Sequence, residues 1–146
     1  MRSFSLLVIG LFMLSVNVWE TNFQIAKKKA DTEHKFILLN FSGSDWCGPC
    51  IRMHDDIFES SSFKNFAENN LVLVNADFPR LKKNQLPKEQ QKDNDKLADR
   101  YDPEGVFPFT VLLSPDEKVI MTWTGYPNAT AEQFTGQLKD LINVRK

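Results

Sequence analysis

The feature that most constrains this chain is an apolar run that ends in a short polar loop carrying two cysteines. It spans residues 38–50, LLNFSGSDWCGPC, and the segment that follows has apolar side chains at helical spacing, at Met53, Ile57 and Phe58. The pattern predicts a strand, a loop and then a helix that begins at Cys47. Unpaired backbone N–H groups and the helix dipole favour an anion at such an end. For a cysteine that anion is the thiolate, which is the form that attacks.

The spacing of the two cysteines supports a reactive pair. Cys47 and Cys50 lie three residues apart, so in a first helical turn they share one face and can form a disulfide without unwinding the helix. Pro49 is tolerated in a first turn because its missing N–H would have had no partner there. Gly48 is expected to leave the outer sulfur uncrowded. Cys-x-x-Cys sites of this kind lower the thiol pKa from about 8.5 to roughly 3.5–7.5.

The motif resembles a known active site. Residues 46–50, WCGPC, follow an apolar strand as they do in thioredoxins. The longer string of residues 41–47, FSGSDWC, is more similar to exported bacterial thioredoxin-like proteins than to small cytosolic ones. The resemblance covers roughly residues 19–142. It implies an α/β thioredoxin fold, a central mixed β-sheet flanked by helices on both faces, and thiol-disulfide oxidoreductase activity, with Cys47 and Cys50 as the catalytic pair and Trp46, Gly48 and Pro49 as supporting residues.

Other uses of a cysteine pair fit less well. The chain has no further cysteines, and only His34 and His54 could complete a zinc site, at unhelpful spacing. Haem attachment needs a His directly after the second Cys, where Ile51 stands. A purely structural disulfide stays open, although a short loop gains little stability from one. We therefore expect no metal and no cofactor beyond the redox-active disulfide.

Periodicity predicts the remaining elements. Continuous apolar runs predict strands buried on both faces of a parallel sheet, and later segments predict two antiparallel strands. Helices are expected before the first strand, with Trp19 on the apolar face, and after Ser60, after Pro87 and from a capping box at residues 130–133. The predicted strands are residues 36–41, 71–76, 110–113 and 118–123; the first helix is residues 19–30.

The resemblance also implies a substrate-binding loop. By analogy with the family, Pro108 is expected to follow a cis peptide bond from Phe107, to face the cysteines, and to pair its neighbouring backbone with the substrate chain. An ordinary trans proline at a strand start is the alternative, and base rates favour trans. Gly125 is expected near the same surface.

Asn40 marks a departure from the family. Thioredoxins often carry a buried acid on the strand before the motif, where it helps to deprotonate the second cysteine. The matching position is Asn40, allowing for a loop one residue longer, and an amide accepts no proton at neutral pH. His54, on the same helical face as Cys50, is either a substitute base or a plain surface residue. If His54 is a surface residue, water is the base that deprotonates Cys50.

The N-terminal residues 1–18 have the pattern of a targeting segment. Arg2 precedes an apolar run over residues 4–14, as in a signal peptide. The run is short for a membrane span, which needs about 20 residues, but the cleavage site is poor, so an uncleaved N-terminal anchor is the alternative. We expect an exported protein, periplasmic or secreted, with residues 19–146 as the thioredoxin-like domain.

Residues 78–102 form the least familiar part of the chain. The basic, polar stretch of residues 80–86 lies between Pro79 and Pro87, and minimal thioredoxins have a shorter connection here. The segment is either a partner-docking surface or a solvated connector, and the connector is favoured.

The functional expectation is a protein-disulfide reductase, since Gly-Pro between the cysteines resembles reducing members of the family. The alternative is a non-catalytic thioredoxin-like module that uses the same groove to hold a peptide or partner. An exported reductase needs electrons, which we expect from a membrane thiol-transfer partner. A net charge of −1 gives no reason to expect nucleic-acid binding, and we expect a monomer.

Overall fold

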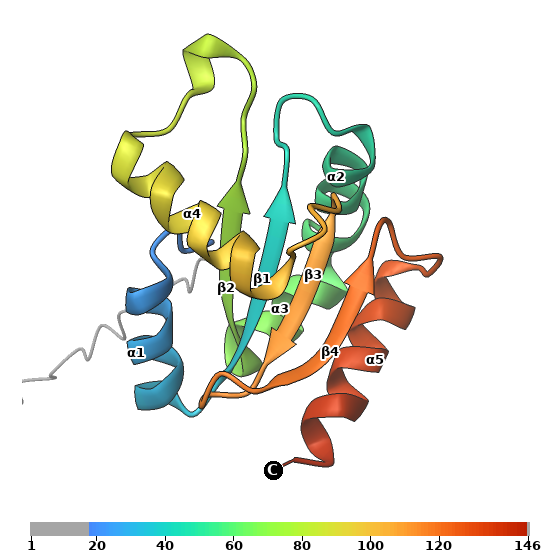
Figure 1. Ribbon diagram of the computed structural model, residues 1–146. Coiled ribbons are helices and arrows are strands. Elements are labelled where there is room, and N and C mark those ends of the chain that lie inside the picture. Colours follow the sequence, from blue (N-terminus) through green and yellow to red (C-terminus); the bar gives the residue numbers. More distant parts are fainter. Residues whose placement is uncertain (1–17, 146) are drawn as a thin grey trace, which may run out of the picture.

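The computed structural model describes residues 18–145, which form a four-stranded sheet with helices on both faces (Figure 1). The strand order is β2-β1-β3-β4. β1 and β2 are parallel, whereas β3 runs antiparallel to both β1 and β4. The predicted mixed sheet is confirmed, with each strand within one or two residues of its expected bounds. The strands are β1 Phe36–Ser42, β2 Leu71–Asp77, β3 Phe109–Leu113 and β4 Val119–Thr124.

The helices pack as two layers on the sheet. The α-helices are α1 Phe23–Glu33, α2 Gly48–Met53, α3 Ser61–Asn70, α4 Lys88–Tyr101 and α5 Ala131–Asn143; a π-helical turn, η1 His54–Phe58, continues α2, and η2 Lys82–Asn84 is a 3-10 turn. α1 and α4 cover one face, and α2, η1, α3 and α5 cover the other (Figure 1). Every residue of β1 is buried because each face of this strand meets a helical layer.

Alternation along β1 divides the core between the two faces. Phe36 and Leu38 pack with the layer of α3 and α5, and Ile37 and Leu39 pack with the layer of α1 and α4. Successive side chains of a strand point to opposite faces, so a continuous apolar run is what a strand between two layers requires. The parallel strands β1 and β2 have their carboxyl ends at the same end of the sheet, and the loops that follow both strands leave from that end (Figure 1).

Local capping residues set the helix starts that the sequence predicted. The Ser60 hydroxyl accepts the N–H of Phe63, so α3 begins where expected. Thr130 and Gln133 form both halves of the capping box of α5. These contacts satisfy N–H groups that have no partner inside the helix.

The expectation for Trp19 is wrong in one respect. α1 begins at Phe23 because the Asn22 side chain accepts the N–H groups of the two residues after Phe23. Trp19 lies before the helix, and its ring packs 5.0 Å from that of Phe58. The adjacent Glu20 pairs with β2, where its N–H donates to the Leu73 carbonyl at 2.8 Å. The apolar spacing extends to residues before the start of α1, because Trp19 packs against the core from an extended segment.

The predicted targeting segment falls almost wholly outside the described residues, which begin at residue 18. Within residues 18–145, no helix combines the length and apolar character that crossing a bilayer requires.

The segment between β2 and β3 divides into two parts. The first is a polar loop that contains η2, and the second is α4, which begins after Pro87 as predicted and buries Leu97. Asn94 is also buried, and its amide donates to the Asp77 carbonyl at 2.9 Å. This bond ties α4 to the end of β2.

Candidate active site

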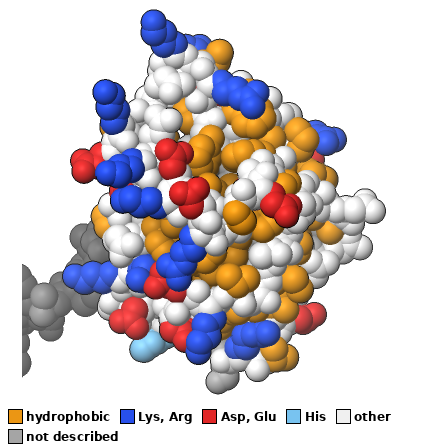
Figure 2. Space-filling model, in the orientation of Figure 1, with side chains coloured by type: hydrophobic (Ala, Val, Ile, Leu, Met, Phe, Trp, Pro, Cys, Tyr) orange, Lys and Arg blue, Asp and Glu red, His pale blue; other side chains and the backbone are white. Residues whose placement is uncertain are grey.

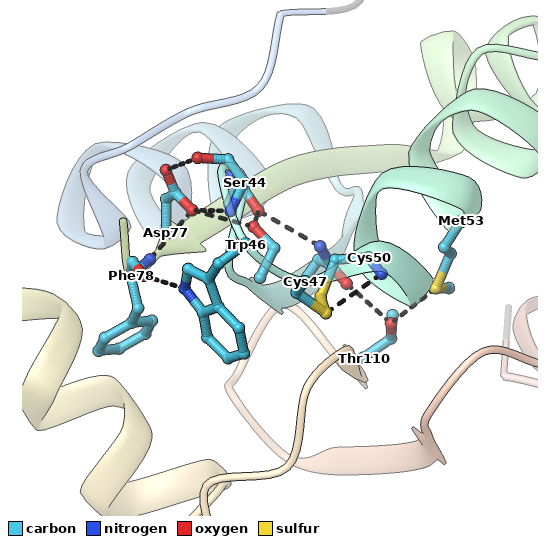
Figure 3. Close-up of a disulfide and its surroundings, with 11 residues drawn as sticks. Ser44, Trp46, Cys47, Cys50, Met53, Asp77, Phe78 and Thr110 are labelled. Carbon is cyan, nitrogen blue, oxygen red and sulfur yellow. Dashed lines mark hydrogen bonds between the residues drawn. A yellow bond between two sulfur atoms is a disulfide. The ribbon is translucent and has the colours of Figure 1, made fainter. Parts of the chain in front are cut away.

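Cys47 and Cys50 are joined by a disulfide in the first turn of α2, with an S–S distance of 2.16 Å (Figure 3). Cys47 is the N-cap residue, and its sulfur accepts the N–H of Cys50 at 3.3 Å. The predicted position of Cys47 at a helix N-terminus is therefore confirmed. The side chains of both cysteines are almost fully covered, at 4% and 5% exposure, whereas Gly48 and Pro49 are exposed. A side chain on Gly48 would meet no atom within 4 Å, so packing gives no reason for a glycine there.

Asp77, at the end of β2, holds the loop before the cysteines. Its carboxylate accepts the Ser44 N–H at 2.9 Å and the Ser44 hydroxyl at 2.5 Å, and the Ser42 hydroxyl lies 3.4 Å away (Figure 3). Gly43 lies under Trp46, where an added Cβ would come within 2.2 Å of the indole ring. The path of the cysteine loop therefore depends on Asp77 of β2 and on the lack of a side chain at Gly43.

Trp46 joins the cysteine loop to two other segments. Its indole N–H donates to the Phe78 carbonyl at 2.7 Å (Figure 3). Its ring meets the edge of Phe107, with centroids 5.5 Å apart. The guanidinium of Arg80 lies 3.6 Å above the ring centroid, which is a cation–π contact. The indole is therefore fixed on three sides, directly before Cys47.

Asp45 binds the loop that follows β2. Its carboxylate accepts the backbone N–H groups of Arg80 and Leu81, each at 2.9 Å, and the Asn84 amide at 3.0 Å. The hydrogen bond from the Arg80 N–H, with those from Asn84 and Leu81, lowers the pKa of the Asp45 carboxyl below its ordinary value of 3.8. These bonds favour the charged form, because an ionised carboxylate is the stronger acceptor.

The residues expected to bind substrate are joined to one another, and Phe107 among them contacts Trp46. The Phe107–Pro108 peptide bond is cis, as predicted, and Pro108 is buried. Its carbonyl accepts the N–H of Gly125 at 2.8 Å. Gly125 has a φ of +77°, a conformation that side chains disfavour. Phe107 contacts Trp46, and Gly125 is joined to this loop through Pro108; the role of the three residues in binding stays a prediction.

Asn40 lies in a neutral polar network at the centre of the sheet. Its amide donates to the Asn75 side-chain oxygen at 3.3 Å, and its own oxygen accepts the Thr110 hydroxyl at 3.0 Å. The Ser42 hydroxyl also donates to the Asn75 oxygen, at 2.9 Å. Thr110 contacts Met53 of α2, at 4.0 Å (Figure 3). The position where the family often carries a buried acid is therefore occupied by an amide with uncharged hydrogen-bond partners. Asn40 is 6% exposed.

A cavity of about 390 Å³ lies beside this network, and its lining combines polar Asn40, Ser42, Asn75 and His54 with Cys50 and the apolar side chains of Trp19, Ile51 and Phe58. It has room for water, and the polar side chains offer hydrogen-bond partners. His54 itself is about half exposed, and its ring nitrogens lie 3.1 Å from Asp55 and 3.6 Å from Glu59. Among residues 18–145, His, Cys, Asp and Glu side chains form no cluster of three or more that could hold a metal ion.

Four residues that hold this site are not predicted from the sequence: Asp45, Asp77, Arg80 and Asn75. Asp45 was part of the motif that carried the family resemblance, but no role was assigned to it. Asp77 ends a strand parallel to β1, which was the available indication that it meets the loop after β1. The partners of Arg80 and Asn75 depend on strand register, which the sequence pattern did not define.

Comparison with known proteins places the chain among redox proteins. The model of the thioredoxin-like domain family matches residues 23–142. The disulfide bond reductase DsbH of Chlamydia pneumoniae is 35% identical over 127 residues, which are 87% of this chain and 74% of that protein. A solved structure of a DsbH oxidoreductase superposes with a TM-score of 0.80 at 30% identity, covering 99% of this chain and 96% of that one. The thioredoxin-related protein DsbJ of Chlamydia pneumoniae is 26% identical over 125 residues, 86% of this chain but only 35% of DsbJ.

Proposed function

We propose that this chain, which belongs to the thioredoxin-like family and is a thiol-disulfide oxidoreductase, reduces protein disulfides in the cell envelope. The observation that carries the proposal is the Cys47–Cys50 disulfide in the first turn of α2, with the Cys50 N–H directed at the Cys47 sulfur. A relative that is named a disulfide bond reductase supports the reducing direction.

In the first step the reduced protein attacks with Cys47. The Cys50 N–H and the helix N-terminus stabilise a negative charge on the Cys47 sulfur. The thiolate attacks one sulfur of the substrate disulfide, so that bond breaks and a mixed disulfide with Cys47 forms. The other substrate sulfur leaves as a thiolate and takes a proton from water.

In the second step Cys50 resolves the mixed disulfide. Cys50 loses its proton and attacks the Cys47 sulfur, which releases the second substrate thiolate and leaves the disulfide seen in the structure. Two electrons have then passed from the protein dithiol to the substrate. Because the Asn40 amide accepts no proton, we assign the proton from Cys50 to water in the adjoining cavity, with His54 at the cavity wall as a further acceptor.

We place the substrate chain on the surface beside Trp46. Phe107 and Trp46 supply an apolar contact, with ring centroids 5.5 Å apart. The backbone next to Pro108 is the proposed pairing partner of the substrate during the mixed-disulfide stage. Gly125 braces this loop through its bond to the Pro108 carbonyl.

The setting of the reaction follows from the sequence. We propose that residues 1–18 direct export or anchor the chain, and that residues 19–146 work outside the cytoplasm as a monomeric domain. A membrane thiol-transfer partner would then return two electrons to the Cys47–Cys50 disulfide after each turnover.

An insulin-reduction assay with dithiothreitol tests the proposal. The wild type should accelerate insulin precipitation, and Cys47→Ser should abolish that acceleration because the attacking sulfur is gone. In a separate incubation of the pre-reduced variant with insulin and no dithiothreitol, Cys50→Ser should accumulate mixed disulfides, detectable by mass spectrometry and released when dithiothreitol is added. Alkylation of the reduced protein at mildly acidic pH should label Cys47 first. A wild type no faster than dithiothreitol alone would favour the non-catalytic binding module.

A further inference from the structure

The loop that follows β2, residues 78–87, is fixed against the cysteine loop. Asp45 accepts two of its backbone N–H groups and one of its side-chain amides, and Trp46 donates to its first carbonyl. Within the loop, the Gln85 amide donates to the Pro79 carbonyl at 3.0 Å. The backbone of this loop, and Arg80 on it, therefore hold a defined position relative to the cysteine loop, which a solvated connector would not need.

Three basic side chains of this loop are exposed, Arg80, Lys82 and Lys83, and we call them the basic rim. Within the described part of the chain, no carboxylate lies at ion-pair distance from any of them, and residues 78–87 contain no Asp or Glu. The neighbouring carboxylates of Asp45 and Asp77 are already engaged by N–H and hydroxyl groups. Lys and Arg side chains lie along the upper edge of the molecule, where this loop is (Figures 1 and 2).

Arg80 places its positive charge on the residue that precedes the attacking cysteine. Its guanidinium lies on Trp46, the residue directly before Cys47. A guanidinium stacked on a ring keeps its N–H groups free for a carboxylate, which it can bind with two parallel hydrogen bonds. Because Phe107 and Arg80 both contact Trp46, a substrate chain at the proposed site lies close to Arg80.

We propose that the basic rim docks an acidic segment of the substrate protein, so that disulfides flanked by carboxylates are the preferred targets. This inference rests on the proposed function and deepens it by naming a substrate class. A protein is the occupant rather than a membrane, because clusters that bind anionic lipid have about four to eight basic residues. Complementary charge at such a rim raises the association rate and the selectivity of binding.

The test compares two peptides of equal length, each with one internal disulfide, flanked on both sides by Glu in one and by Gln in the other. The measured quantity is the second-order rate constant for oxidation of the pre-reduced protein, followed by tryptophan fluorescence. At low ionic strength we expect the wild type to prefer the Glu peptide by about tenfold, and Arg80→Gln to lower that ratio about fivefold. About 1 M salt, which shortens the Debye length to ~3 Å, should remove the preference.

Two variants sharpen the result. Arg80→Lys keeps the charge and should retain most of the preference. Lys139→Gln removes an equal charge from an exposed site on α5 and should leave the ratio unchanged.

Equal rates for the two peptides with the wild type would overturn the basic rim as a docking site. So would an equal loss for both peptides in Arg80→Gln, which would assign Arg80 to loop structure or to Cys47 reactivity. Binding of the full chain to phosphatidylserine vesicles that depends on Arg80, without a peptide preference, would also overturn it. A reduced wild type that reacts with neither peptide nor with insulin would instead contradict the proposed function.

Discussion

The substitution Asn40→Asp tests whether the missing acid limits the second step of the reaction. In the protein the Asn40 amide donates to Asn75 while its oxygen accepts from Thr110. A protonated aspartic acid preserves both bonds, since its O–H replaces the amide donor. An ionised one loses the donor and places two acceptor oxygens face to face, in a site that is 6% exposed. Both effects favour the protonated form.

The burial of Asn40 sets the size of the pKa shift, and the pKa shift sets the expected change in the resolution rate. Full burial raises a carboxyl pKa by about 3–5 units, and because a cavity adjoins Asn40, we take the lower end, ~3 units above an ordinary value of about 3.9. The pKa of the introduced carboxyl in the folded state is then about 7. General bases contribute about 10²–10⁴-fold, but the adjoining cavity leaves room for water to accept the proton, so we expect resolution by Cys50 to accelerate about tenfold above pH 7. Attack by Cys47 should change little.

The same substitution predicts a pH-dependent loss of stability. Because the folded pKa is raised, the unfolded state releases the proton first. The variant is therefore equal to wild type below about pH 4 and loses about 1.4 kcal/mol of unfolding free energy per pH unit above it, levelling near ~4 kcal/mol once the folded state ionises. Urea unfolding at several pH values measures this loss.

Stopped-flow fluorescence, with one disulfide substrate in excess over the reduced protein, separates attack by Cys47 from resolution by Cys50. Asn40→Leu is the matched control, because it removes the amide at similar size without supplying a base. Faster resolution should appear in the Asp variant alone, with a pH profile that rises near 7. An unchanged resolution rate, in a variant that shows the stability loss, would refute the argument, because a buried base would then be present without effect.

Two further predictions concern the loop before the cysteines. Gly43→Ala should lower the unfolding free energy by about 1–3 kcal/mol and displace Trp46, visible as a fluorescence shift, because the added Cβ would lie 2.2 Å from the indole; an unshifted spectrum with full stability would contradict this contact. For Asp45, whose pKa is lowered by the N–H groups it accepts, the loop contacts should persist above pH 3.8 and be lost as the pH falls through the lower folded value. NMR titration of those N–H signals should give a midpoint below 3.8 that is absent in Asp45→Asn, and a midpoint at or above 3.8 would argue against these bonds.

Local pattern was sufficient for most of the fold. The apolar run of residues 36–41 is buried on both faces, as a strand between two helical layers must be. The capping residues Ser60 and Thr130 begin helices where expected, because a cap acts within a few residues of sequence. Trp19 shows the limit of this reasoning. Apolar spacing reports only that a side chain packs against the core, and Trp19 does so, partly buried, from an extended segment that pairs with β2.

By itself, the sequence determined the chemistry at the cysteines and the class of fold, because both depend on residue types at short spacing. Only the tertiary structure decided what surrounds the sulfurs. Asp45 meets Arg80 across 35 residues, and Asn40 meets Asn75 across the same separation. These contacts are set by the register of parallel strands and by the loops that leave one end of the sheet. Register is a property of packed strands together, so the neutral network and the basic rim appear only when the chain is folded.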